Sequence, residues 1–201
     1  MKDDIIRLTE KQMNSNYHKI KNIFHSQYDF MELNALRDEI CRCIVCGFSQ
    51  AALTLTNTLL ELTTISVVDR AQKLNIHMDT TKIDKKQYGS SDSNLGYRIE
   101  MLYYGRIISE LQREDLHKCR IWLRNTFSHA DLKSVGKEKM PIEILNLDEQ
   151  TKTDCTKSLL DLPMLKGIAF QMSAEENYIN YFLYVDNFIR YVELKLQNYG
   201  S

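Results

Sequence analysis

The sequence predicts an all-α fold, an antiparallel four-helix bundle with an extra N-terminal helix and an inserted segment before the C-terminal helix. Three observations support this prediction. Glycine (7) and proline (2) are scarce among the 201 residues, so few positions favour tight turns. Apolar side chains recur every three or four residues along most of the chain, which is helical spacing. The sequence shows no internal repeat and no convincing sheet pattern.

The first half of the chain contains three predicted helices. Residues 4–26 are amphipathic, and 31–46 continue the pattern until Gly47 interrupts it. Ser49 is a suitable N-cap for a longer helix that ends near Leu74. That helix is so rich in apolar residues that we expect it at the centre of the bundle.

The second half is less regular. Residues 76–93 lack periodicity and are predicted to form a loop, and helices are predicted over 95–111 and 114–130. Leu116, Leu123 and Phe127 are expected to be buried together. The segment 131–173 is mixed, with a short helix predicted near 153–161 and a strand-like run at 142–145. The final helix is predicted over 174–197. We therefore expect one domain over 1–201, made of an N-terminal helix (1–30), a core (31–130), an insertion (131–173) and the C-terminal helix.

Composition narrows the class of protein. With 43% hydrophobic and 26% charged residues, the chain is neither low-complexity nor disordered, and a formal net charge of −1 gives no global field for a polyanion. The first 30 residues carry too many charges for a signal peptide. Hydroxyl and amide side chains interrupt the longest uncharged stretch, 43–60, which argues against a membrane span. An odd count of five cysteines suits a reducing compartment. These features predict a cytoplasmic protein with no membrane association.

One helical segment carries chemistry. On a helical wheel, Arg124, Asn125, Ser128 and His129 share one face, and the opposite face is apolar. On periodicity alone, a solvated helix face that happens to hold a histidine is the better explanation of this pattern. However, Ile121 and the single tryptophan, Trp122, also lie on the polar side. Because Trp and Arg are favoured interface anchors, we expect Ile121 and Trp122 to form a dimer interface.

The spacing Arg124-Asn125-x-x-x-His129 resembles the signature of the HEPN superfamily, helical bundles of which many members are RNA endonucleases. Gly47-Phe48 and the apolar helix after them also resemble the segment that precedes this motif in HEPN proteins. The resemblance covers residues 31–130 well and the last helix loosely. It implies a homodimer in which two motifs face one cleft. It also implies cleavage to a 2′,3′-cyclic phosphate and a 5′-hydroxyl, in a bacterial toxin or antiviral-defence setting. An antitoxin or regulator, such as a nucleotidyltransferase-like protein, would be its partner.

The chemistry is consistent without the family name. RNA carries its own nucleophile, the 2′-hydroxyl, so cleavage requires no metal ion and no cofactor. His129 can move protons near neutral pH, and Arg124 can hold a phosphate as negative charge develops. Asn125 can hydrogen-bond His129, the phosphate or the ribose.

Four further residues are weaker candidates. Glu61 lies within an apolar helix, and its carboxylate needs a partner. That partner is Arg124 or His129 in a catalytic role, or Arg98 or Arg106 in an interhelical salt bridge. Lys133, Lys137 and Lys139 follow the motif and could hold flanking phosphates of RNA, although such loop charges are usually only solvated.

The remaining cysteines and histidines do not predict a further functional site. Of Cys41, Cys43 and Cys46, the first two point to nearly opposite sides of a helix and no fourth ligand is near, so no metal site is predicted. His77 and His117 are expected at the surface. Two alternatives remain: a non-catalytic HEPN-like module that binds RNA, a nucleotide or a partner protein, and a structural protein in which Arg124 and His129 are dimer contacts.

Overall fold

The computed structural model describes residues 2–89, 91–92, 94–121, 139–146, 151–158 and 163–200. Most of these residues are helical, which confirms the predicted helical character. The elements, in chain order, are α1 (Lys2–Phe24), η1 (Met31–Leu33), α2 (Asn34–Val45), α3 (Ser49–Lys73), η2 (Thr80–Lys82), α4 (Lys85–Tyr88), α5 (Leu95–Tyr104), α6 (Glu110–Cys119), β1 (Lys139–Asn146), β2 (Thr151–Ser158) and α8 (Pro163–Gly200).

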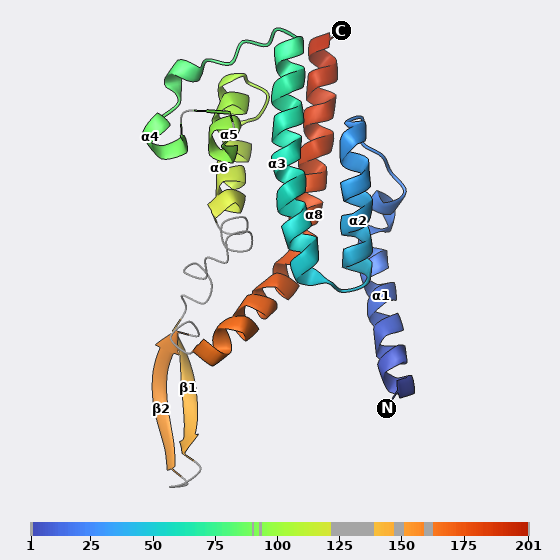
Figure 1. The fold of residues 1–201 in the computed structure, drawn as a ribbon, viewed down its shortest axis with the longest axis vertical. Helices are drawn as coiled ribbons and strands as arrows, with labels where there is room; N and C mark the ends of the chain where they lie inside the picture. The colour runs from blue at the N-terminus through green and yellow to red at the C-terminus, as the bar shows by residue number, and fades with distance from the viewer. Residues whose placement is uncertain are drawn as a thin grey trace.

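Helix α3 is the centre of the described structure. It packs against α8, α2 and α5, and α8 lies beside it along much of its length (Figure 1). Leu53, Leu60 and Val67 are fully buried. Apolar side chains are therefore needed on several sides of α3, which explains why its sequence is apolar almost all round. The predicted central position of this helix is confirmed.

The helix directions differ from the prediction. The chain reverses between α1 and α2 and again between α2 and α3, but α8 runs parallel to α3 (Figure 1). Asn57, in the first half of α3, contacts Tyr181 of α8. Phe30 lies under Arg70 near the end of α3, and its amide bonds Glu193 near the end of α8. The predicted all-antiparallel arrangement is therefore wrong for this pair, because periodicity specifies a buried face and not a direction.

The region between α3 and α6 corrects two predicted boundaries. Helix α5 ends at Tyr104, not at 111, because the chain turns at Gly105 and at Arg106, whose φ is +56°. Helix α6 begins after Ser109, whose hydroxyl and the side chain of Gln112 form a capping box, so it starts earlier than the predicted residue 114. The predicted loop at 76–93 contains the short helices η2 and α4, which Asp79 and Asp84 cap.

The inserted segment contains a β-hairpin. Strand β1 includes the strand-like run at 142–145 and pairs with β2 in antiparallel register, Ile142 opposite Cys155. The helix predicted near 153–161 is therefore wrong: the threonines at 151, 153 and 156 favour an extended strand. Helix α8 starts at Pro163, not at 174, with proline in its first turn. Of the three residues expected to be buried together, Leu116 is fully buried, whereas Leu123 and Phe127 lie outside the described residues.

Polar side chains inside α3 are satisfied within the protein. Thr56 and Thr63 are fully buried and donate to the carbonyls four residues earlier, at 2.7 Å each. The Asn57 Oδ1 atom accepts a hydrogen bond of 2.9 Å from the Tyr181 hydroxyl. Among the described helices, only α3 is long and apolar enough to cross a membrane, and just over half of its most apolar stretch is buried. This is a weak signal that a core helix also gives.

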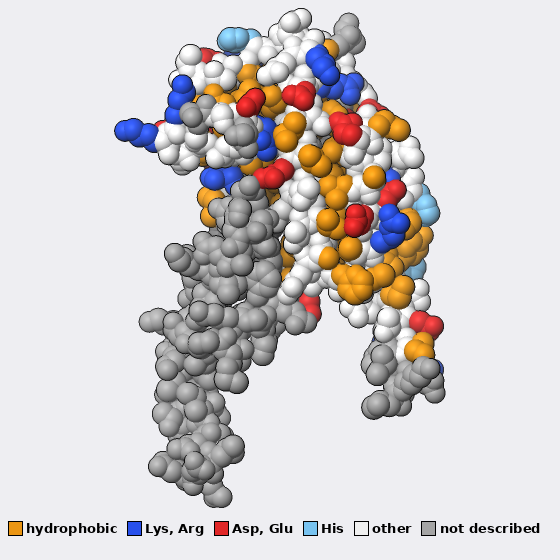
Figure 2. All heavy atoms as spheres, viewed as in Figure 1, with side chains coloured by type: hydrophobic (Ala, Val, Ile, Leu, Met, Phe, Trp, Pro, Cys, Tyr) orange, Lys and Arg blue, Asp and Glu red, His pale blue; other side chains and the backbone are white. Residues whose placement is uncertain are grey.

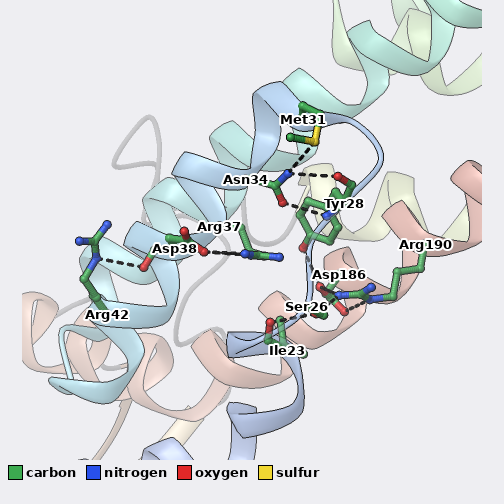
Figure 3. Close-up of polar contacts among 10 residues, drawn as sticks. All are labelled: Ile23, Ser26, Tyr28, Met31, Asn34, Arg37, Asp38, Arg42, Asp186 and Arg190. Atoms are coloured by element: carbon green, nitrogen blue, oxygen red, sulfur yellow. Dashed lines mark hydrogen bonds and ion pairs between the residues drawn. The ribbon is translucent and has the colours of Figure 1, made fainter.

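A buried polar cluster joins the α1–α2 connection to α8 (Figure 3). The Tyr28 hydroxyl donates to Asp186 Oδ1 at 2.6 Å, and Arg190 Nε donates to Asp186 Oδ2 at 2.9 Å. The Arg37 and Arg190 guanidinium carbons each lie 5.3 Å from the centre of the Tyr28 ring. Burial, then the Asp186 charge, raises the pKa of Tyr28, which therefore stays a neutral donor. The cluster fixes the chain between α1 and α2 against the last helix.

Replacing Tyr28 with phenylalanine tests this cluster. The variant deprives the buried Asp186 carboxylate of one donor, so we expect a loss of about 1–3 kcal/mol in the free energy of unfolding. Urea denaturation followed by circular dichroism measures it. Tyr17→Phe is the matched control, since the Tyr17 hydroxyl contacts His25 at the surface; its effect should stay within about 0.5 kcal/mol. Equal effects from the two variants would contradict the assigned role of Tyr28.

Candidate functional site

Six of the residues that the sequence predicts for the site lie outside the described residues, among them all three motif residues. These are Trp122, Arg124, Asn125, His129, Lys133 and Lys137. Lys139 is the first residue of β1. Ile121 lies just beyond Arg120, which follows α6, and it is 47% exposed. The contacts among the motif residues therefore remain predictions, and the described part of the site is the region that leads into them.

Glu61 is half-buried on α3, close to Arg98 of α5. The Thr64 hydroxyl donates to the Glu61 carbonyl at 2.8 Å and accepts from Arg98 Nε at 2.8 Å. Arg98 is only 4% exposed, and its Nη1 also donates to the Asp92 carbonyl. Glu61 and Arg98 thus share Thr64 as a neighbour. The partner of the Glu61 carboxylate itself stays a prediction.

A buried ionic cluster joins α5 to α6, immediately before the motif. The Glu100 side chain is 2% exposed, and its Oε1 atom accepts two hydrogen bonds, from Arg113 Nε at 2.8 Å and from His117 Nε2 at 2.7 Å. Arg113 and His117 are four residues apart, so one face of α6 presents both to the same carboxylate. The hydrogen bond to Glu100 raises the pKa of Arg113, which keeps this guanidinium charged. We call Glu100, Arg113 and His117 the Glu100 cluster.

The protonation state of His117 follows from these contacts. Because a carboxylate only accepts, Nε2 must carry the proton. Burial lowers the pKa of His117 below its ordinary value, since desolvation outweighs the opposing effects of the hydrogen bond and charge of Glu100. His117 is therefore a neutral imidazole with its proton on Nε2. Its Nδ1 atom is buried and has no hydrogen-bond partner within the described part of the chain.

Aromatic and cationic groups cover the other side of His117. The Tyr88 ring stacks on the imidazole, with centroids 4.7 Å apart and planes 22° from parallel. The Arg120 guanidinium lies 5.9 Å from the centre of the same ring. A Cβ atom at Gly96 would lie 3.3 Å from Tyr88 and 3.5 Å from Arg120, so glycine permits this close approach. Helices α4, α5 and α6 thus hold His117 and Arg120 in one packed unit.

The backbone changes at the end of this unit. Arg120 and Ile121 are π-helical, directly after α6 and directly before the motif. Such turns are rare, and within helices they occur frequently at functional sites. The Glu100 cluster thus fixes α6 at its buried face, and a local irregularity follows where the sequence places its candidate catalytic residues.

The buried thiols of Cys41 and Cys119 do not add a reactive thiolate. Burial raises the pKa of Cys119 to about 11 and that of Cys41 to about 12, so both are protonated thiols at neutral pH. Cys41, Cys43 and Cys46 are free, and no group of metal-ligating side chains occurs among the described residues.

The sequence analysis missed the Glu100 cluster. His117 was expected at the surface, but its side chain is only 12% exposed. The four-residue spacing of Arg113 and His117 was a usable signal, because it places two proton donors on one helix face. Their acceptor is on another helix, 17 residues from His117 along the chain, and periodicity does not reveal such a pairing.

The titration of His117 tests this geometry. Since its folded pKa is lowered, the folded state binds this proton less readily than the unfolded state does. The contribution of His117 to stability is therefore fully present above the unfolded pKa and is lost as the pH falls through the folded pKa. We expect an NMR titration to give His117 a pKa below the ordinary value for histidine. We also expect His117→Gln to lose less stability than wild type between pH 7.5 and 5.5. A His117 pKa above the ordinary histidine value would contradict this.

Comparison with known proteins does not assign this chain to a family. No protein-family model, no curated protein and no solved structure matches this chain. The function is therefore argued from the motif and from the helix that leads into it.

Proposed function

We propose that this protein is a metal-independent endoribonuclease that cleaves RNA through the 2′-hydroxyl, as a bacterial toxin or antiviral-defence effector in the cytoplasm. The proposal rests on the motif Arg124-Asn125-x-x-x-His129 and its resemblance to HEPN nucleases. The structural observation that supports it most directly is the π-helical turn at Arg120 and Ile121. This turn ends a helix anchored by a buried carboxylate and opens the segment that carries the motif.

Each motif residue has a defined role in this mechanism. His129 takes the proton from the 2′-hydroxyl as the oxygen attacks the phosphorus, or gives a proton to the departing 5′-oxygen. Arg124 forms a bidentate contact with the phosphate, which gains negative charge in the transition state. Asn125 orients the ribose or His129. The products are a 2′,3′-cyclic phosphate and a 5′-hydroxyl.

The described residues before the motif suit an anionic substrate. Arg113 pairs with Glu100 and His117 is neutral, and Arg120 places a further guanidinium beside the Tyr88 ring at the end of α6. On the rest of the face shown in Figure 2, acidic and basic side chains are mixed. An RNA contact must therefore come from a local cluster, and Arg120 is the described cation closest in sequence to Arg124. Lys133, Lys137 and Lys139 would extend this contact to flanking phosphates.

One His and one Arg make a small active site, and dimerisation would double it. Ile121 is a large apolar side chain, 47% exposed, next to Trp122 in sequence. With Trp122 it would form an apolar pair, and aromatic and apolar side chains are enriched at the core of protein interfaces. We therefore propose a homodimer through Ile121 and Trp122 that brings two motifs to one cleft, with an antitoxin or regulator, such as a nucleotidyltransferase-like protein, controlling it.

A non-catalytic module that binds RNA, a nucleotide or a partner protein is the second candidate. The mixed surface charge and the net charge of −1 favour its nucleotide-binding or protein-binding form, because domains that bind RNA often carry a broad basic face. A structural protein using Arg124 and His129 as dimer contacts is the third. Catalysis separates the first candidate from the other two.

Cleavage of single-stranded RNA in the presence of EDTA is the direct test. We expect wild type to cut, because the mechanism uses no metal ion. His129→Ala should lose activity on the order of 10²-fold or more, Arg124→Ala should lose most of it, and Asn125→Ala should lose less. Gel analysis should show 2′,3′-cyclic phosphate ends, and DNA, which lacks the 2′-hydroxyl, should stay intact.

His77→Ala and Arg42→Ala are matched controls, since both side chains are exposed and lie outside the motif. They should cleave as wild type does. Cleavage that requires a metal ion, equal cleavage of DNA, or full activity in His129→Ala would reject the nuclease proposal and favour the binding module.

The dimer has its own test. Light scattering at micromolar concentration should give about twice the chain mass of 23.6 kDa, and Trp122→Ala or Ile121→Asp should shift the protein toward the monomer. Leu111→Asp is the control. Leu111 is an exposed apolar residue like Ile121, but it lies in the first turn of α6 and not beside Trp122. A monomeric wild type would contradict the proposed interface.

A further inference from the structure

A cleft of about 400 Å³ lies where three parts of the chain meet: the segment after α3, the turn between α5 and α6, and the end of α8. These parts lie together at the upper end of the bundle in Figure 1. Three cations, Lys82, Arg106 and Lys195, and three tyrosines, Tyr103, Tyr104 and Tyr191, line it. We call it the tyrosine cleft. Ser109 at the start of α6 also lines it, so the tyrosine cleft is at the opposite end of α6 from Arg120.

The charge in the tyrosine cleft is unbalanced. No carboxylate is among the residues that line it. Lys82 pairs with Asp79 at 3.0 Å, so its charge is partly offset. Arg106 and Lys195 have no carboxylate partner within the described part of the chain. Two cations facing one hollow without a counter-charge favour an anionic ligand.

The backbone at Arg106 adds a second observation. Helix α5 ends with hydrogen bonds from the Arg106 amide to the Tyr103 carbonyl and from the Ile107 amide to the Leu102 carbonyl. This ending places Arg106 in the left-handed region, with φ at +56°, where glycine is preferred. An arginine is strained there, and strain of this kind occurs preferentially at functional sites. Here it directs a guanidinium to the cleft.

The tyrosines provide planar apolar surface beside these cations. The Tyr103 and Tyr104 rings contact edge to face, with centroids 5.2 Å apart, and the Arg113 guanidinium lies over Tyr103 at 4.7 Å. Tyr191 comes from α8 and is 37% exposed. Aromatic side chains of this type stack on nucleobases with little regard to sequence. The cleft volume is also within the range of small-ligand sites.

We infer that the tyrosine cleft binds a nucleoside phosphate, either a free nucleotide or one unit of an RNA strand. Arg106 and Lys195 contact the phosphate, and the tyrosines contact the base. Cations alone would suit a simple anion, and tyrosines alone an apolar ligand; their combination selects a molecule that has both parts. The inference does not depend on nuclease activity, because none of the six residues belongs to the motif.

Calorimetric titration of the full chain tests this with four probes: ADP, pyrophosphate, adenosine, and a 2′-O-methyl hexa-adenylate that has no free 2′-hydroxyl at its internal linkages. We expect ADP to bind with a Kd below 1 mM, and pyrophosphate and adenosine each to bind at least about tenfold more weakly, because each lacks half of the ligand. If neither ADP nor the oligonucleotide binds at millimolar concentration, the inference is overturned. Pyrophosphate binding as tightly as ADP would also overturn it.

Arg106→Gly is the most informative variant, since it removes the guanidinium and also relieves the left-handed strain. We expect about tenfold weaker binding together with an equal or higher Tm, which a general loss of structure could not produce. Lys195→Gln and Tyr191→Leu should also weaken binding about tenfold or more. Lys21→Gln, an exposed lysine on α1, is the matched control and should bind as wild type does. Unchanged binding in both Arg106→Gly and Lys195→Gln would place the ligand elsewhere and overturn the inference.

The same titrations identify the source of the ligand. Binding of the oligonucleotide at least about tenfold tighter than ADP supports an RNA strand that passes through the tyrosine cleft. Binding of ADP that is equal or tighter supports a free nucleotide. An inactive His129→Ala protein that still binds ADP separates this site from the proposed nuclease centre.

Discussion

The burial of α3 on several sides is the constraint on which the rest of the structure depends. A helix in this position must satisfy each of its buried polar groups without water. Thr56 and Thr63 do so by donating to carbonyls of their own helix. Asn57 accepts a hydrogen bond from Tyr181, and Thr64 accepts one from Arg98. Two of these contacts reach other helices. The polar residues of α3 thus specify which helices pack against it, and its apolar residues provide the free energy of that packing.

The buried carboxylate of Glu100 on α5 fixes the position of α6, the helix that leads to the motif. Because this carboxylate is buried, losing either Arg113 or His117 would remove one of the two donors that it has among the described residues. The orientation of α6 relative to α5 is therefore determined by directed hydrogen bonds as well as by hydrophobic packing. Arg120 and Ile121 then leave the regular α-helix from a rigid base.

The sequence predicted the helices well and their connections less well. Periodicity located α1, α2, α3 and the later part of α8 because each has an apolar face. It joined α5 to the segment after it because Arg106 and Ile107 fit the helical spacing, although Arg106 turns the chain with a positive φ. It also left His117 at the surface, since the burial of a histidine depends on an acceptor from another helix. The motif residues Arg124, Asn125 and His129 were identified from type and spacing, and their arrangement stays a prediction because they lie outside the described residues.

The contacts of the α1–α2 connection have a consequence for the order of folding. Tyr28 bonds Asp186, and Phe30 bonds Glu193, across 158 and 163 residues of chain. Contacts this distant in sequence form late, since a long loop must close before they contribute. During synthesis, the residues around Tyr28 leave the ribosome long before their partners on α8 exist. The N-terminal helices therefore reach their final packing only when the last helix is complete, and a truncated chain would expose the Tyr28 ring and its unpaired hydroxyl to chaperones and proteases.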